Sequence, residues 1–132
     1  NIYGEGHRPN HNSVIATFCH QIKNDLEVNL FAKGEATLDL IHVDNVIDVM
    51  VNIRATNKNQ SQIYNLASGN SISINEVIEN LQKISGADIK TKLIEGAKRE
   101  FSINVDKLKN DYPDIRYCNI FDGLKKTYEN DL

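Results

Sequence analysis

The sequence has 132 residues, of which 40% are hydrophobic and 25% charged, and its formal net charge is −3. This length and composition are those of a single globular domain, and the slight acidity excludes the basic field typical of proteins that bind nucleic acid or anionic lipid. No apolar run approaches the length that spans a bilayer, and the only two cysteines, Cys19 and Cys118, favour a reducing, cytoplasmic compartment while leaving a disulfide between them open.

The chain opens with a polar, bend-rich segment, residues 1–13, that contains two glycines, a proline, three asparagines and two histidines. It runs directly into an apolar stretch, Val14–Cys19, that is compatible with a helix. A polar loop before a helix start is a good place to hold an anionic or polyhydroxylated ligand. The first three residues, Asn1-Ile2-Tyr3, have the pattern of the end of a strand, which predicts that further sequence precedes them.

In the first half of the chain, Ser13 is predicted to cap a helix from Val14 to Asn24. Alternating apolar and polar residues predict one strand over Leu26–Phe31, and a second short strand is expected over Leu38–Val43. Asp44 is expected to cap the next helix, with its buried stripe formed by Val46, Ile47, Val49, Met50 and Ile53.

In the second half, a polar loop is followed by a predicted strand over Gln62–Ala67. The capping-box pattern Ser73–Glu76 predicts a helix that Gly86 ends. The remaining predicted elements are a strand over Ile89–Ile94, a short helix from Asp106 to Lys109 and a final helix over Phe121–Tyr128. Strands and helices interleave throughout, which indicates an α/β or α+β fold.

The residues alone show no catalytic machinery. Gly4-x-Gly6 lacks the third glycine of a dinucleotide fingerprint, no serine elbow is present, and no pair of carboxylates has the pattern of an acid/base couple. His42 is expected to be a packed histidine hydrogen-bonded to the backbone, and a metal site is not favoured. Arg8 and Arg99 could each pair with a phosphate, although a solvated surface charge is the simpler interpretation of either residue.

Three segments together resemble one family: Asn1–Gly4, then Asp39–Val46, then Tyr64–Gly69 followed by Ser73–Glu76. They are similar to the N-V-Y-G, D-F/Y-I-H-V-D-D and Y-N-x-G-S-G patterns of the extended short-chain dehydrogenase/reductases, the NAD(P)-dependent sugar-nucleotide epimerases, dehydratases and reductases. Their order and spacing match across essentially the whole chain.

This resemblance implies that residues 1–132 are a single C-terminal substrate-binding domain of a Rossmann-type α/β enzyme, a small mixed sheet with helices, without the N-terminal cofactor domain. It implies a nucleotide-sugar substrate, bound by Tyr3, Arg8, Asn10, Asn12, Ser13 and Arg99. NAD or NADP would be the cofactor of the full-length parent. No cofactor is expected for these residues alone, because the glycine-rich loop and the catalytic Tyr-x-x-x-Lys pair lie upstream in the family.

Two positions depart from the common pattern: the proline after N-V-Y-G is Glu5, and the frequent arginine before the D-Y-I-H-V segment is Leu38. The segment from Arg8 to His20 resembles the capsule and O-antigen 4-keto-sugar reductases, which favours a reductase. An epimerase, a dehydratase or a non-catalytic binding module remain alternatives. A domain without its cofactor partner is also expected to expose an apolar face and to self-associate as a homodimer or higher oligomer.

Overall fold

A computed structural model of the protein describes residues 1–11, 13–56 and 61–130. Short strands alternate with helices along these residues, as the predicted α/β class requires. The elements are β1 (Ile2–Tyr3), α1 (Val14–Lys23), β2 (Val28–Phe31), the 3₁₀ turn η1 (Ala32–Gly34), β3 (Thr37–Asp39), β4 (Ile41–His42), α2 (Val43–Ala55), β5 (Ser71–Ser73), α3 (Ile74–Ser85), β6 (Thr91–Ile94), α4 (Asp106–Asp111) and α5 (Ile120–Glu129).

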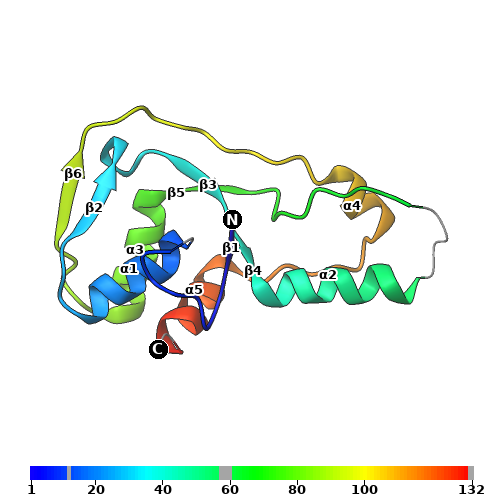
Figure 1. Ribbon diagram of the computed structural model, residues 1–132, viewed down its shortest axis with the longest axis horizontal. Helices are drawn as coiled ribbons and strands as arrows, with labels where there is room; N and C mark the ends of the chain where they lie inside the picture. Colours follow the sequence, from blue (N-terminus) through cyan, green and yellow to red (C-terminus); the bar gives the residue numbers. More distant parts are fainter. Residues whose placement is uncertain (12, 57–60, 131–132) are drawn as a thin grey trace.

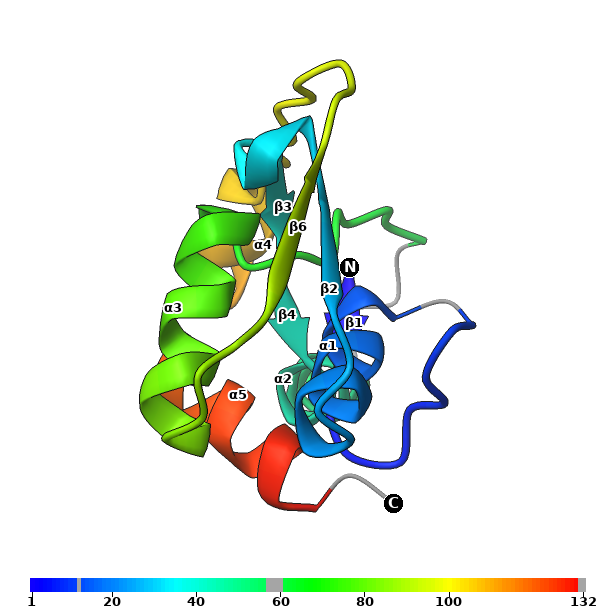
Figure 2. The same cartoon turned by 90° about the vertical axis from the view of Figure 1, so that its left-hand side faces the viewer.

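The described strands form three separate two-stranded pairings. β1 runs parallel to β4, with Ile2 opposite Ile41, and β2 runs parallel to β6, with Val28 opposite Thr91. β3 and β5 are antiparallel, and Leu38 lies opposite Ile72. Figure 2 shows β2 and β6 side by side, next to α1 and α3.

Local chemistry fixes the ends of the best-defined helices. Ser13 caps α1 by accepting a hydrogen bond from the Ala16 N–H at 3.3 Å, as predicted. Ser73 and Glu76 form the predicted capping box of α3, and Gly86 ends that helix in the left-handed conformation at φ 67°.

The buried apolar residues fall into two clusters. The main core lies between α1, α3, α5 and β2, at one end of the molecule (Figure 1). A smaller core lies at the other end, where α2 packs against α4. The main core consists of Tyr3, Ile15, Phe18, Cys19, Ile22, Val28, Leu30, Leu40, Ile74, Val77, Ile78, Leu81 and Leu124, and the smaller one of Val49, Leu108 and Tyr112.

Three features of the sequence-based secondary structure were wrong. The predicted strand over residues 62–67 is irregular chain, since none of the described strands pairs with it. The predicted strand over 38–43 is divided at Leu40 because β3 and β4 pair with different partners. α2 begins two residues earlier than predicted, because the Nδ1 atom of His42, rather than the side chain of Asp44, accepts the capping hydrogen bond.

The buried stripe predicted for α2 is only partly buried: Val46 and Ile53 are half-buried, and two of its five residues are exposed. Val49 is 2% exposed and belongs to the smaller core, whereas Ile47 and Met50 are 53% and 63% exposed. The helix extends away from the main core (Figure 1), so only a narrow line of its side chains has a packing partner. None of the helices in the described ranges is long and apolar enough to cross a membrane.

Candidate functional site

A cavity of about 720 Å³, here called the main cavity, opens between the start of α1, the exposed face of β2 and the strand β3. Its wall combines apolar side chains with a few polar groups, a composition typical of small-molecule sites. The lining residues are Asn1, Asn10, His11, Ser13, Val14, Thr17, Phe18, Gln21, Asn29, Phe31, Ala36, Leu38 and Ile74.

Hydrogen bonds fold the opening loop back onto the first turn of α1. Asn10 has a left-handed backbone at φ 57°, a conformation that asparagine tolerates better than most residues. Its N–H donates to the Thr17 hydroxyl at 2.9 Å, and that hydroxyl donates to the Ser13 carbonyl at 2.9 Å. The loop therefore has a defined shape at the point where α1 presents backbone N–H groups without helical partners.

A second cavity of about 360 Å³, here called the loop cavity, lies within the opening segment. Its walls are formed by Gly6, His7, Arg8, His11 and Ser13, so it shares His11 and Ser13 with the main cavity. No carboxylate side chain is among the described residues that line either cavity. With the Arg8 guanidinium, the His7 and His11 imidazoles and the start of α1, the walls of the two cavities together favour a negatively charged ligand.

The structure brings together three of the predicted substrate-binding residues. Asn10 and Ser13 line the main cavity, and Arg8 lines the adjoining loop cavity. Asn12, which was also predicted to bind substrate, lies outside the described residues. Residues of the predicted ligand loop and of the predicted helix start therefore line the walls of the two cavities.

The other two predicted residues, Tyr3 and Arg99, line neither cavity. Tyr3 is 2% exposed, and its ring packs edge-on against His42 at a centroid distance of 5.2 Å. Burial raises the pKa of its hydroxyl far above the usual value. Arg99 is exposed beside β3, where its carbonyl accepts a hydrogen bond from the Thr37 N–H at 2.9 Å.

Sequence reasoning missed Gln21, Asn29 and Phe31 as cavity residues. β2 alternates buried and exposed positions, so Asn29 and Phe31 project from the same face, opposite Val28 and Leu30. The alternation itself was recognised in the sequence. However, only the fold shows that the polar face of this strand lines a cavity instead of facing open solvent.

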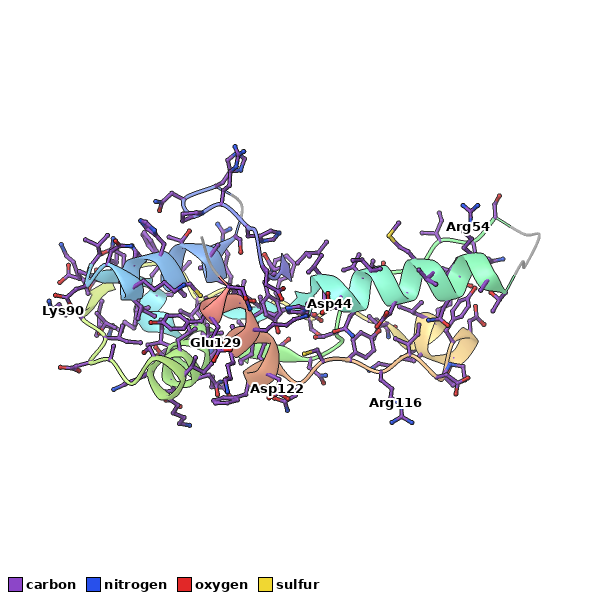
Figure 3. All side chains as sticks on the ribbon, turned by 90° about the horizontal axis from the view of Figure 1, so that it is seen from below. Asp44, Arg54, Lys90, Arg116, Asp122 and Glu129 are labelled. Carbon is purple, nitrogen blue, oxygen red and sulfur yellow. The ribbon has the colours of Figure 1, made fainter. Side chains whose placement is uncertain are left out.

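A charged cluster joins the opening loop to α2 and α5. Lys126 of α5 lies 3.3 Å from the Glu5 carboxylate and also hydrogen-bonds Asp44, which lies where α2 begins, beside α5 (Figure 3). His42 is 2% exposed, and its Nε2 atom lies 3.4 Å from Glu5. The hydrogen bond between the His42 ring and the Asp44 N–H confirms the prediction of a packed, backbone-bonded histidine.

These contacts lower the pKa values of both carboxylates. The pKa of Asp44 is lowered chiefly by its hydrogen bond from Lys126. The pKa of Glu5 is lowered first by its own backbone N–H and then by Lys126. Both effects favour the charged forms, so the two carboxylates are ionised at neutral pH.

The described residues do not fit a dinucleotide cofactor or a metal ion. Gly4 follows β1, but a Cβ at Gly4 would lie 2.5 Å from Val43 Cγ1, so its missing side chain makes room for α2 instead of for a pyrophosphate. Gly4 also precedes an irregular loop instead of a helix, unlike the glycines of a dinucleotide fingerprint. Within the described ranges, no group of three or more His, Cys, Asp or Glu side chains is arranged to hold a metal.

Comparison with known proteins finds a matching family and a relative of this chain. The sequence model of the NAD dependent epimerase/dehydratase family matches residues 1–67. A relative in Pseudomonas aeruginosa, UDP-2-acetamido-2,6-beta-L-arabino-hexul-4-ose reductase, is 28% identical over 81 residues, which make up 61% of this chain and 22% of the relative.

Solved structures of related enzymes have the same fold. UDP-glucose 4-epimerase from Thermotoga maritima, solved with UDP-glucose, superposes on 98% of this chain with a TM-score of 0.82 and 26% identity. UDP-glucuronic acid 4-epimerase from Bacillus cereus, solved with UDP-glucuronic acid and NAD, also covers 98% of the chain, with a TM-score of 0.86 and 23% identity. The chain spans 43% and 42% of the lengths of these two structures. From the match over residues 1–67, which is half of its length, the chain belongs to the NAD dependent epimerase/dehydratase family.

Proposed function

We propose that this chain is the nucleotide-sugar-binding portion of an NAD(P)-dependent nucleotide-sugar 4-keto reductase. The observation that carries the proposal is the pair of cavities that meet at His11 and Ser13, lined by polar and cationic groups without a carboxylate. The 28% identity to a UDP-sugar reductase supports the choice of reaction.

In this proposal, the diphosphate of the ligand lies over the start of α1. Asn10, Ser13 and the first N–H groups of the helix would contact its oxygens, which uses the positive end of the helix dipole. Arg8 would approach from the loop cavity. Arg99 would approach from beside β3, because its side chain is exposed and its backbone is tied to Thr37.

NAD or NADP would bind to other parts of the whole protein, because residues 1–132 contain neither a Tyr-x-x-x-Lys sequence nor a glycine-rich cofactor loop. These residues would supply binding energy and orientation of the sugar. We therefore expect them to bind a nucleotide sugar but to transfer no hydride. Oxidation of NADPH or NADH by these 132 residues with a 4-keto-sugar nucleotide would contradict this expectation.

Two alternatives have observations in their favour. The similarity to UDP-glucose 4-epimerase at 26% identity makes an epimerase, or a related dehydratase, the second candidate. A non-catalytic sugar-nucleotide binding module is the third, because the described residues form cavities but place no carboxylate in their walls. Product analysis with the whole protein would separate the first two, since a reductase consumes one reduced cofactor per sugar and an epimerase consumes none.

Titration calorimetry with UDP and UDP-N-acetylglucosamine tests the binding proposal. We expect Arg8→Ala and Arg99→Ala each to weaken binding of both ligands about tenfold, as loss of a charged hydrogen bond does. Arg54→Ala is the matched control, since Arg54 is exposed near the far end of α2 (Figure 3). The proposal fails if the wild type binds neither ligand, or if Arg8→Ala and Arg99→Ala both behave like Arg54→Ala.

We also propose that these residues self-associate and function in the cytoplasm. Ile47, Met50 and Val51 form an exposed apolar line on α2, and Ile63 is 88% exposed. Cys19 is buried and Cys118 is exposed, and no disulfide joins these two described residues, which fits a reducing compartment. Light scattering at rising protein concentration should show a dimer or larger species, and Met50→Glu should shift it toward monomer; a wild type that stays monomeric would refute self-association.

A further inference from the structure

A single side chain, that of Glu5, joins the first half of the opening loop to two helices. One of its carboxylate oxygens lies 3.3 Å from Lys126 Nζ on α5, and the other lies 3.4 Å from His42 Nε2, where α2 begins. The Glu5 side chain is only 27% exposed. Water therefore competes less for these contacts than it does for a fully exposed surface ion pair.

Other contacts hold both partners of Glu5 in place. Lys126 also pairs with Asp44, and its helix is anchored in the main core by Leu124, which is 0% exposed. His42 is buried, and because its Nδ1 atom accepts from the Asp44 N–H, the neutral ring carries its proton on Nε2. This nitrogen makes no hydrogen bond with the described residues. A buried donor without a partner is unfavourable, which favours keeping the Glu5 carboxylate beside it.

The backbone around Glu5 has little stiffness of its own. Gly4 and Gly6 flank it with φ values of 153° and 77°, and glycine has the widest choice of backbone conformations. The residues that follow, His7 and Arg8, line the loop cavity with Gly6. The hydrogen bonds described above hold the far end of the loop on α1. The position of the cavity wall between these two ends therefore depends on how firmly Glu5 is held.

We propose that Glu5 is a positioning residue for the loop cavity: its contacts with Lys126 and His42 hold the opening loop in the conformation that places Arg8 in the cavity wall. Glu5 is one of the two positions at which the sequence departs from the pattern that it otherwise resembles, and a proline there could make neither contact. The inference rests on the proposed function only where it concerns ligand affinity, because the tether acts on the loop with or without a ligand.

Two explanations of Glu5 predict opposite effects on affinity. If its negative charge acted only through space, removal of the charge would strengthen the binding of an anion in the cavity. If Glu5 holds the loop, the same change weakens binding, because a smaller fraction of the molecules has the cavity wall in place. Glu5→Gln keeps the size of the side chain and removes the charge, so the sign of its effect separates the two explanations.

Titration calorimetry with inorganic pyrophosphate and with UDP measures this sign. We expect Glu5→Gln to bind both ligands about fivefold more weakly than the wild type. Asp44→Asn is the matched control, because it removes the same charge from the same cluster but belongs to α2 instead of the loop. Its affinities should equal those of the wild type or slightly exceed them.

Variants of Lys126 test whether Glu5 acts through this lysine. Lys126→Met should weaken binding as Glu5→Gln does, and Lys126→Arg, which can still pair with Glu5, should bind as the wild type does. The double variant Glu5→Gln/Lys126→Met should bind no more weakly than the weaker single variant, because both changes break the same contact. Additive losses would show that the two residues act separately and would overturn the tether.

Backbone NMR order parameters test the tether without any ligand. In the wild type, the amides of Gly6, His7 and Arg8 should have values of about 0.85, as in rigid backbone, and in Glu5→Gln they should fall below about 0.6. Asp44→Asn should keep the wild-type values. The values within α3 should be the same in all variants, which would exclude a general loss of folding.

The outcomes separate the tether from the function on which its role in binding rests. If Glu5→Gln leaves the order parameters of the loop unchanged, the tether is wrong. If Glu5→Gln loosens the loop but binds the ligands as tightly as the wild type or more tightly, the positioning role is wrong. If the wild type binds neither pyrophosphate nor UDP, the proposed function itself fails, and the order parameters still decide whether Glu5 holds the loop.

Discussion

We expect Asp39→Asn to destabilise the protein more than the same replacement of carboxylate by carboxamide at any other described acidic residue. The Asp39 carboxylate is 0% exposed, and it accepts hydrogen bonds from the Ser68 N–H at 2.8 Å, the Ser68 hydroxyl at 2.7 Å and the Gly69 N–H at 2.9 Å. In either orientation, the amide of asparagine turns an NH₂ group toward at least one of these backbone donors. The variant therefore loses a charge-assisted hydrogen bond and leaves a buried donor unpaired.

Each of these two effects is about 1–3 kcal/mol, so we expect Asp39→Asn to lower the free energy of unfolding by about 3 kcal/mol. With a urea dependence of about 1.5 kcal/mol per molar, the midpoint should fall by about 2 M. Circular dichroism during urea titration measures this shift. Asp48→Asn is the control, because Asp48 is exposed on α2, and its midpoint should stay within about 0.3 M of the wild type. A shift for Asp39→Asn as small as that of the control would refute the reasoning.

Three further changes test other parts of the structure. Ser73→Ala removes the cap of α3 and should lower the free energy of unfolding by about 1 kcal/mol, measured by the same titration. Gly123→Ala should lower it by about 2 kcal/mol, because a Cβ at this position would overlap the buried hydroxyl of Tyr3. Lys126→Met should lower the urea midpoint at pH 7, and the difference from the wild type should shrink as the pH falls below about 4. The sign follows from the lowered pKa values of the two carboxylates that Lys126 contacts: their stabilisation is complete above the ordinary carboxyl pKa and disappears as they become protonated.

Each of these changes has a matched control. Ser102→Ala alters an exposed serine outside any helix cap. Gly96→Ala places a Cβ at 3.4 Å from the Ala32 nitrogen, an ordinary contact, so it should be nearly neutral. Lys125→Met removes a lysine of the same helix whose ion pair with Glu129, at 3.9 Å, is exposed on the surface. A pH-independent effect of Lys126→Met, or equal effects of the two glycine variants, would contradict the structural explanation.

The sequence predicted those features that depend on residues close to one another in the chain. The caps at Ser13 and Ser73 and the end of α3 at Gly86 follow from local hydrogen bonds and backbone preference, and all three were correct. The strand predicted over residues 62–67 was wrong and the buried stripe of α2 was only partly correct, because apolar periodicity shows which face could be buried but does not supply a partner.

The same distinction applies to the candidate site. Asn10 and Ser13 were predicted because the loop and the helix start are contiguous in sequence, and both line the main cavity. Gln21 and Phe31 belong to different elements, and their proximity depends on how α1 packs beside β2. No pattern within either segment shows that one would face the other across a cavity.

The separation of the apolar residues into two clusters has a consequence for hydrogen exchange. The smaller cluster contains only Val49, Leu108 and Tyr112 as fully buried members, and it holds the outer part of α2 against α4. Because this cluster is small, it can unfold while the main core stays folded. Amide hydrogens in α4 and in the outer turns of α2 should therefore exchange through a sub-global unfolding of low free energy. A ligand in the main cavity would slow the exchange of α1 and β2 amides but leave the exchange at the α2–α4 end unchanged. The exchange pattern would thus divide the chain into a ligand-responsive unit and an independent one.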